Sequence, residues 1–419
     1  MSLWYLTWRS LLNRKLASLL TIISIGLSVT MLLGVERIRM EARASFANTI
    51  SGTDLVVGSR GGAVQLLLYS VFRIGNATNN IDWKSIEAIA ALEDVDWIIP
   101  ISLGDSHRGF RVVGTNEQYF KHYRHGSKQP LEFAAGEPFD GLFDAVLGAE
   151  VARKLNYQVG SKMVVAHGTG NINLRSHDDK PFTVVGVLKP TGTPVDRAVH
   201  VSLEAIEAIH LNWQSGSPIP GLDIRADQVT KFNLKPKEVT AALVGLDSRI
   251  ATFSVQRFIN EFQGEPLQAI LPGVALQELW SLLAVAEQAL LAVSILVVLV
   301  GLLGMVTVIL NSLNDRRREL AILRSVGARP RDIFVLLSSE AALVSAGGIA
   351  LGTALLYLGL IIARPLLLDY AGLAIQIRML SSYEWSLLGM VMAAALVISV
   401  IPGYRAFRLS LSDGLTIKL

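Results

Sequence analysis

The chain has 419 residues, of which 51% are hydrophobic and 17% are charged, and its formal net charge is +3. Soluble globular domains carry about 25% charged residues, and the mean hydropathy of this chain is +0.44. The composition therefore argues against an ordinary water-soluble protein. Cysteine is absent, so no disulfide contributes to the fold in any compartment.

Four apolar segments are each long enough to cross a membrane. The first, 16–35, contains no charged residue, and three more follow at 282–310, 333–362 and 385–404. At 1.5 Å per residue, about 20 apolar residues span a hydrocarbon core of about 30 Å. The first segment is too long for a signal-peptide core and no small-x-small cleavage site follows it. We therefore expect four transmembrane α-helices.

Positive charges predict the orientation, because short loops rich in Lys and Arg stay in the cytoplasm. Such loops are the N-terminal segment 1–15, the segment 311–332 and the tail 405–419. Both termini are thus expected in the cytoplasm. The loop 363–384 and the large segment 36–281 are expected on the outer side of the membrane.

The large segment 36–281 shows the pattern of an α+β domain inserted between the first two spans. Its start, 36–50, continues the first span with apolar residues four apart and predicts a stalk helix. Short β-branched runs predict strands, and helical patterns occur at 82–92, 149–156, 203–210 and 236–246. A strand–helix–strand order near Asp54 recurs near Leu222, where the expected helix is 236–246 and the expected strand 249–255. We therefore expect a core subdomain at about 103–220, inserted into a subdomain with two similar halves. The apolar stretch Leu66–Phe72 is interpreted as core, or otherwise as a surface for a lipidic substrate.

Several short sequences together resemble the MacB/FtsX-type (mechanotransmission, type VII) permeases of ABC transporters. They are Gly136-Glu-Pro-Phe, the runs 147–155, 182–188 and 196–201, the long run 315–333 (DRRRELAILRSVGARPRDI), Glu340 with three glycines after it, and Pro402-Gly-Tyr-Arg-Ala. The resemblance covers nearly the whole chain. It implies a permease pair, identical or paralogous, that associates with two copies of a cytoplasmic ABC ATPase. It also implies a location in the bacterial inner membrane, with the segment 36–281 and the loop 363–384 in the periplasm.

The segment 314–326 predicts a short helix with an apolar stripe. Gly327 suits a left-handed C-cap, and Pro330 cannot continue the helix. Such a helix can dock into a groove of a partner, and the resemblance implies that it couples to the ATPase. The alternative is a solvated helix attracted to anionic lipid. The candidate coupling residues are Arg316, Glu319, Leu320, Leu323, Arg324, Val326 and Gly327.

The sequence contains no phosphate-binding G-x-x-x-x-G-K-[ST] loop, no H-E-x-x-H and no G-x-S-x-G. We therefore expect no enzymatic activity and no cofactor in this chain, with ATP and Mg bound by the separate ATPase. Glu287 and Glu340 are the polar residues near the spans, and we expect interface or hydrogen-bonding roles for them rather than proton transfer. The stalk residues singled out are Glu36, Arg39 and Trp280.

All seven histidines lie between positions 107 and 210. His122-x-x-His125 and His177 are candidate zinc ligands, but the spacing does not predict a complete four-ligand site. We therefore expect no metal, and only weak zinc binding by the isolated domain.

The leading hypothesis is a permease subunit that uses ATP hydrolysis by its partner to move the periplasmic domain. Its substrate would be a lipid, lipoprotein, peptide or drug-like molecule that is exported or extracted. One alternative is a non-transporting regulator of a periplasmic partner such as a cell-wall hydrolase. Another is zinc handling through the outer domain.

Overall fold

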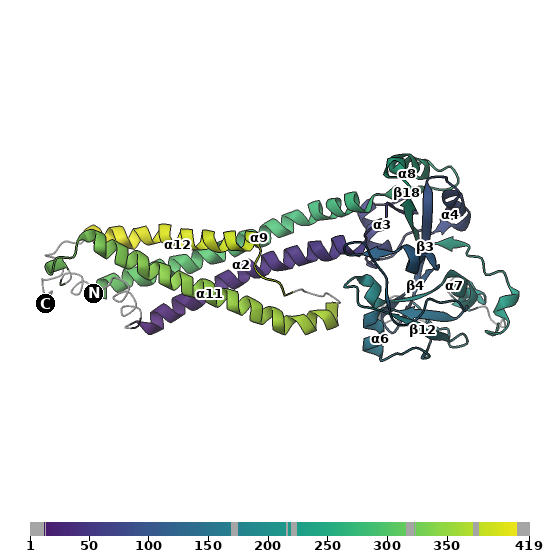
Figure 1. Cartoon of the computed structure of the whole chain (residues 1–419), viewed down its shortest axis with the longest axis horizontal. Coiled ribbons are helices and arrows are strands. Elements are labelled where there is room, and N and C mark those ends of the chain that lie inside the picture. The colour runs from purple at the N-terminus through teal and green to yellow at the C-terminus, as the bar shows by residue number, and fades with distance from the viewer. Residues whose placement is uncertain are drawn as a thin grey trace. The chain divides into compact units, whose positions relative to one another are not determined.

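The structure is a computed structural model, and it describes residues 12, 14–168, 175–214, 217–218, 224–315, 322, 324–371 and 377–408. The chain forms two compact units (Figure 1). The first, here named the helical bundle, comprises Met1–Glu41, Ala284–Leu366 and Ile375–Leu419. The second, here named the sheet domain, comprises Ala42–Leu283 and Leu367–Ala374.

Four long helices are apolar enough to cross a membrane: α2 (Lys15–Thr49), α9 (Pro272–Asp315), α11 (Pro330–Ala371) and α12 (Ser382–Arg408). Two of them extend well beyond the predicted spans. No Gly or Pro interrupts the sequence between 35 and 49, so α2 continues without a break into the sheet domain. Helix α9 likewise begins in the sheet domain and continues into the helical bundle. The chain connections at 41–42 and 283–284 are therefore helical, as the stalk interpretation requires.

Small residues bring α2 and α11 close together in the helical bundle. A Cβ atom on Gly352 would lie 2.6 Å from the carbonyl oxygen of Gly26, and one on Gly348 would lie 2.5 Å from the Ile25 side chain. The Thr30 hydroxyl donates a hydrogen bond of 3.0 Å to the Gly352 carbonyl. Glycines four apart permit such close approach of backbones, and packing and interhelical hydrogen bonds hold helices together in lipid. This contact explains the glycines of the third apolar segment.

The sheet domain is built on a mixed sheet with the order β18-β1-β17-β3-β4-β13-β8-β12-β7. Its strands are β1 (Leu55–Ser59), β3 (Val95–His107), β4 (Phe110–Thr115), β7 (Phe133–Gly136), β8 (Asp144–Leu147), β12 (Phe182–Leu188), β13 (Ala198–Ser202), β17 (Ala241–Leu246) and β18 (Leu267–Ile270). The helices are α3 (Ala63–Ser70), α4 (Trp83–Ala90), α5 (Gln118–His122), α6 (Ala149–Leu155), α7 (Leu203–His210) and α8 (Thr252–Asn260). Apolar side chains of Leu66 and Leu67 in α3 are buried in one core cluster of the domain, so Leu66–Phe72 is core as interpreted.

Strand β3 joins the two halves of the sheet, because it pairs with β17 on one edge and with β4 on the other. Its first half pairs with β17, where Ile101 lies opposite Ala241, and its second half pairs with β4, where Ser102 lies opposite Gly114. The register with β4 shifts between Leu103 and Ser106, as a β-bulge does. On the far side of this irregularity, β3 also pairs with β10 (Ala166–His167). The segment 103–220 supplies β4, β13, β8, β12 and β7.

Two local predictions are wrong. The expected helix 236–246 is instead β16 (Glu238–Val239) and β17, and the expected strand 249–255 is a 3₁₀ turn followed by α8. Residues 241–245 are all buried, since one face of β17 packs in one core cluster (Ala241, Leu243) and the other face in a second cluster (Ala242, Val244). A continuous apolar run of this length fits a buried strand as well as a helix. The strand–helix–strand order does recur, as β1-α4-β3 and β17-α8-β18, one element later than expected.

Candidate functional site

The predicted coupling segment is described only in part. Arg316, Glu319, Leu320 and Leu323 lie outside the described residues. Arg324 is helical, Gly327 has a φ of +105°, and the Val326 side chain is 84% exposed. The left-handed backbone at Gly327 agrees with the predicted end of the helix.

Charged residues of α2 and α9 meet in the helical bundle. The guanidinium of Arg39 donates to both carboxylate oxygens of Glu36, at 3.0 and 2.8 Å. Its other nitrogen lies 3.8 Å from the carboxylate of Glu287 on α9. The structure therefore brings together two of the three stalk residues and one of the two polar residues that the sequence singled out.

A fully buried ion pair joins α2 to the start of α12. Arg37 Nε lies 2.9 Å from Glu384 Oε1, and both side chains are completely inaccessible to solvent. Arg37 Nη1 also donates to the carbonyl of Arg378 at 3.3 Å. Removing one partner of such a pair leaves a buried charge and costs about 3–5 kcal/mol. The contact therefore constrains how α2 and α12 pack.

Glu384 also belongs to a capping box at the N-terminus of α12. The Ser381 backbone N–H donates to Glu384 Oε2 at 2.6 Å, and the Glu384 N–H donates to the Ser381 hydroxyl at 3.2 Å. Neither Arg37 nor Glu384 was among the candidate residues predicted from the sequence. The pattern Ser381-x-x-Glu384 before an apolar run was a usable signal for the cap, but nothing in the sequence identified its partner on α2.

Arg378 extends the same group of charges. Its Nε lies 3.5 Å from the Glu41 carboxylate, and its carbonyl accepts a 3.0 Å hydrogen bond from the Tyr357 hydroxyl. We name the whole group the helix-end charge cluster; its members are Glu36, Arg37, Arg39, Glu41, Glu287, Arg378 and Glu384. It connects α2, α9, α12 and the segment before α12 within the helical bundle.

Glu340 lies elsewhere in the bundle, on α11, with 5% of its surface exposed. It lines a cavity of about 30 Å³ with Arg14, Thr21 and Ser312. Pockets for drug-sized ligands measure about 300–1,000 Å³. This cavity is therefore a packing space and not a substrate pocket.

Trp280, the third predicted stalk residue, packs at the contact between the two connecting helices. Its ring lies 5.4 Å from the ring of Phe46 on α2, edge to face, and 5.4 Å from the guanidinium of Arg43. Phe46 in turn lies 4.4 Å from Phe72, just after α3. The ends of α2 and α9 are thus joined to each other and to the core of the sheet domain.

The three candidate zinc ligands from the sequence have different neighbours in the fold. The ring of His122 stacks on Trp97 at 5.4 Å, and His125 pairs with Gln129 in a two-stranded ribbon. His177, directly after β11 (Arg175–Ser176), instead lies beside His167 and His210, with ring centroids 4.9 and 5.3 Å away. These two histidines were not singled out by the sequence.

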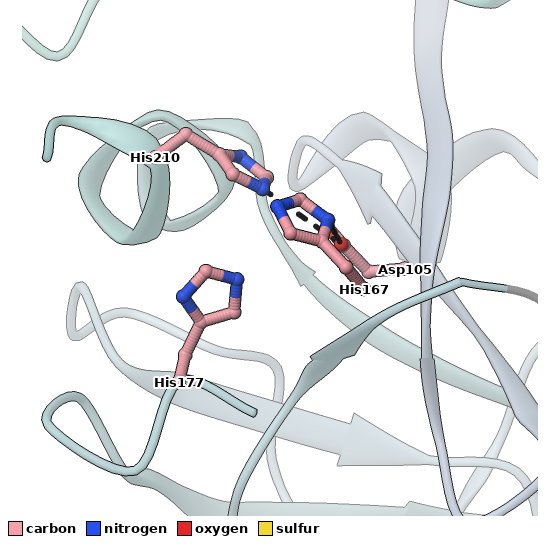
Figure 2. A group of neighbouring side chains, drawn as sticks. All are labelled: Asp105, His167, His177 and His210. Carbon is pink, nitrogen blue, oxygen red and sulfur yellow. Dashed lines mark ion pairs between the residues drawn. The ribbon is translucent and has the colours of Figure 1, made fainter. Parts of the chain in front are cut away.

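Asp105 completes this second group, which we name the histidine cluster: Asp105, His167, His177 and His210 (Figure 2). Asp105 Oδ1 lies 2.8 Å from His167 Nδ1 and 3.7 Å from His210 Nε2. Burial and the neighbouring His210 lower the pKa of His177 to about 4, and burial lowers the pKa of His210 as well. These two imidazoles are therefore neutral at pH 7. The four residues are spread over more than 100 positions of sequence, so only the pairing of β3 with β10 and the placement of α7 bring them together.

Four apolar helices among the described residues, with a sheet-rich α+β domain between the first and the second, define a multi-pass membrane protein with a large extramembrane domain. Residues 18–243 match the MacB-like periplasmic core domain, and residues 291–411 match the FtsX-like permease C-terminal family. The first match covers more than half of the chain. The chain therefore belongs to the MacB/FtsX-type family of ABC transporter permeases of the inner membrane, and its sheet domain is the periplasmic domain of that family.

Individual relatives are distant. The macrolide export ATP-binding/permease protein MacB of Bdellovibrio bacteriovorus is 23% identical over 367 residues, which cover 83% of this chain and 52% of that protein. The chain thus spans about half the length of this curated relative. The periplasmic region of MacB from Actinobacillus actinomycetemcomitans aligns with a TM-score of 0.34 at 12% identity, covering 55% of this chain and 94% of that one. The extracellular domain of the noncanonic ABC-type transporter YknZ from Gram-positive bacteria aligns with a TM-score of 0.31 at 13% identity, covering 52% and 98%.

Proposed function

We propose that this chain is a permease subunit that couples ATP hydrolysis by a cytoplasmic ABC ATPase to motion of its periplasmic domain. The observation that carries the proposal is the continuity of α2 and α9, each of which runs unbroken from the helical bundle into the sheet domain. A continuous helix transmits a rigid-body shift, whereas a Gly-rich linker absorbs it. The motion of the periplasmic domain would drive the export or extraction of a lipidic, lipoprotein, peptide or drug-like substrate.

Two contacts between the connecting helices support this mechanism. In the helical bundle, Arg39 on α2 reaches Glu287 on α9. In the sheet domain, Phe46 on α2 packs against Trp280 on α9. Because the helices contact each other at both places, a shift of one is passed to the other.

The proposed assembly has two permease chains, identical or paralogous, and two ATPase subunits that bind ATP and Mg. Both termini and the segment 311–332 lie in the cytoplasm, where that segment contacts the ATPase. The basic residues flanking the apolar segments support this orientation. The exposed Val326 and Ile322 side chains offer apolar surface for the contact.

The mechanism is tested by breaking the helix between the units. Replacing Arg39–Ala42 with Gly-Ser-Gly-Ser removes helical stiffness, and replacing the same four residues with alanines is the matched control that keeps the helix. Because the chain has no cysteine, Glu93→Cys and Met379→Cys provide two exposed sites for spin labels, one in each unit. The distance between the labels is measured in the assembled transporter with and without ATP and vanadate.

We expect ATP to shift the distance distribution in the wild type and the alanine variant, but not in the Gly-Ser-Gly-Ser variant. An equal shift in all three would show that α2 does not transmit the motion. The same preparations test the coupling segment: Leu323→Asp and Glu319→Arg are expected to reduce co-purification of the ATPase. Wild-type recovery of the ATPase with both variants would remove this segment from the interface.

A further inference from the structure

The histidine cluster brings four potential metal ligands from separate parts of the sheet domain to one place. Asp105 comes from β3, His167 from β10, His177 from the residue after β11, and His210 from the last turn of α7. In Figure 2 the three imidazoles and the carboxylate gather between the helix that carries His210 and the strand that carries Asp105. Such convergence is what a metal site requires and what local sequence spacing did not reveal.

The distances between the four ligand atoms suit an ion with tetrahedral coordination. One ring nitrogen of each histidine and one oxygen of Asp105 all lie within 4.8 Å of one another. Zinc–ligand bonds of about 2.0–2.2 Å place tetrahedral ligands about 3.4 Å apart. The two distances from Asp105 Oδ1, 2.8 Å to His167 Nδ1 and 3.7 Å to His210 Nε2, lie on either side of that value. Small side-chain rotations would therefore bring the four atoms into coordination.

The donor atoms also select a class of ion. Imidazole nitrogen with a carboxylate oxygen suits zinc and other late first-row divalent metals, whereas magnesium and calcium prefer ligand sets made of oxygen. Asp105 is 4% exposed and His177 is fully buried, while the side chains of His167 and His210 are 21% and 27% exposed. The two exposed histidines give an ion access from solvent, and the two buried residues form the inner wall of the site.

We propose that Asp105, His167, His177 and His210 bind one zinc ion in the periplasmic domain. Four protein ligands complete a tetrahedral coordination shell and leave no open position for a reacting water molecule, as in structural zinc sites. The ion would join β3, β10, β11 and α7, so it would stabilise this side of the sheet. The proposal concerns this domain alone and does not depend on the transport mechanism.

The proposal is tested on the full chain in detergent, after removal of any affinity tag and of bound metal with a chelator. Zinc chloride is titrated against a competing chromophoric chelator, and bound metal is counted by mass spectrometry. We expect one zinc ion per chain and an upward shift of the thermal unfolding midpoint. Cobalt(II) in its place should give the visible absorption of a tetrahedral site.

His210→Ala and Asp105→Asn are the informative variants. His210 is the last residue of α7 and is partly exposed, and Asp105→Asn keeps the side-chain shape, so both variants should fold. Each should weaken zinc binding by at least about 100-fold and abolish the thermal shift. His122→Ala and His125→Ala are the matched controls, because both histidines lie in the same domain but outside the cluster, and they should bind zinc as the wild type does.

Three results would overturn the proposal. One is no stoichiometric zinc in the wild-type chain. Another is unchanged affinity in both His210→Ala and Asp105→Asn. The third is loss of binding in His122→Ala or His125→Ala instead, which would place the ion at the pair suggested by the sequence.

Discussion

The helical bundle and the sheet domain each contain buried ionisable side chains, and two examples differ in chemical form. In the bundle, Arg37 and Glu384 are completely buried as a pair of opposite charges. In the sheet domain, burial lowers the pKa of His177 to about 4 and that of His200 to about 3, so both rings are neutral at pH 7. The Arg37–Glu384 pair compensates buried charge with charge, whereas His177 and His200 are buried in their uncharged form.

The difference has a physical cause and a functional consequence. An ion pair in a low-dielectric region is stable only while both partners stay in place, so it fixes the relation between the two helices that carry it. A neutral imidazole needs no charged partner and keeps a lone pair that can accept a proton or a metal ion. The first arrangement suits a unit that must move as a rigid body, and the second suits a site that responds to its surroundings.

Breaking the buried ion pair should have the largest effect on stability. Arg37→Leu leaves the carboxylate of Glu384 buried without its partner and should cost about 3–5 kcal/mol. The measurement is thermal unfolding of the full chain in detergent, together with the yield of monodisperse protein. Glu384→Gln should be similarly harmful, because it leaves the guanidinium of Arg37 without its counter-charge.

The double variant Arg37→Leu/Glu384→Gln is the control for this comparison. A glutamine at position 384 can still complete the capping box with Ser381, so the double variant removes both charges and keeps the cap. It should recover much of the stability lost in the single variants. If each single variant unfolded like the wild type, the pair would not constrain the bundle.

Acid should destabilise the sheet domain through His200. This ring lies 4.9 Å from the ring of Tyr119, and burial, with the charge of Arg73, lowers its pKa to about 3. An unfolded histidine titrates near pH 6.5. Between these values the unfolded state binds a proton that the folded state does not, so the free energy of unfolding falls as the pH falls below about 6.5. The expected loss from His200 is about 2 kcal/mol at pH 5.

The measurement compares thermal unfolding of the full chain at pH 7 and pH 5, followed by near-ultraviolet circular dichroism. His200→Leu removes the titrating ring and should flatten this part of the pH dependence. His125→Leu is the control and should keep the wild-type slope. Equal slopes in all three proteins would mean that His200 does not contribute to acid sensitivity.

The partly exposed contact between Arg39 and Glu287 should have the smallest effect. Its two charged groups are 3.8 Å apart, and the Arg39 side chain is 32% exposed. Ion pairs of this kind contribute about 0–1 kcal/mol. Glu287→Gln should therefore shift the unfolding midpoint only slightly, and a loss as large as that of Arg37→Leu would contradict the contrast drawn between buried and exposed charges.

The fold was predictable where length and periodicity decide it. The backbone N–H and C=O groups of a single apolar segment of about 20 residues find hydrogen-bond partners in lipid only when the segment is helical. The four membrane helices, and the domain inserted between the first two, were therefore predicted. Helices α4, α6 and α7 were recognised by their patterns. Strand β17 was not, because both of its faces are buried in core clusters and its apolar run therefore carries no alternation.

The candidate sites show the same limit. Residues 36 and 39 were singled out because they lie on one continuous helix, and Glu287 because a charge near a span is unusual. Arg37 was missed because its partner lies almost 350 positions away. The histidine cluster was missed for the same reason: Asp105 and His210 meet only after the strands between them have paired.

Strand β3 has a consequence for exchanging parts between related permeases. The Leu103 N–H donates to the Thr240 hydroxyl at 2.9 Å, and the Thr240 N–H donates to the Ile101 carbonyl at 2.8 Å. In a chimera joined at residue 103, β3 would therefore combine halves from two parents. Its first half would then pair with a β17 that evolved with the other parent's β3. Joints before Val95 and after Leu246 keep β3 with both β17 and β4. The shortest segment that keeps β3 with both β17 and β4 is thus 95–246, and it carries the proposed zinc ligands with it.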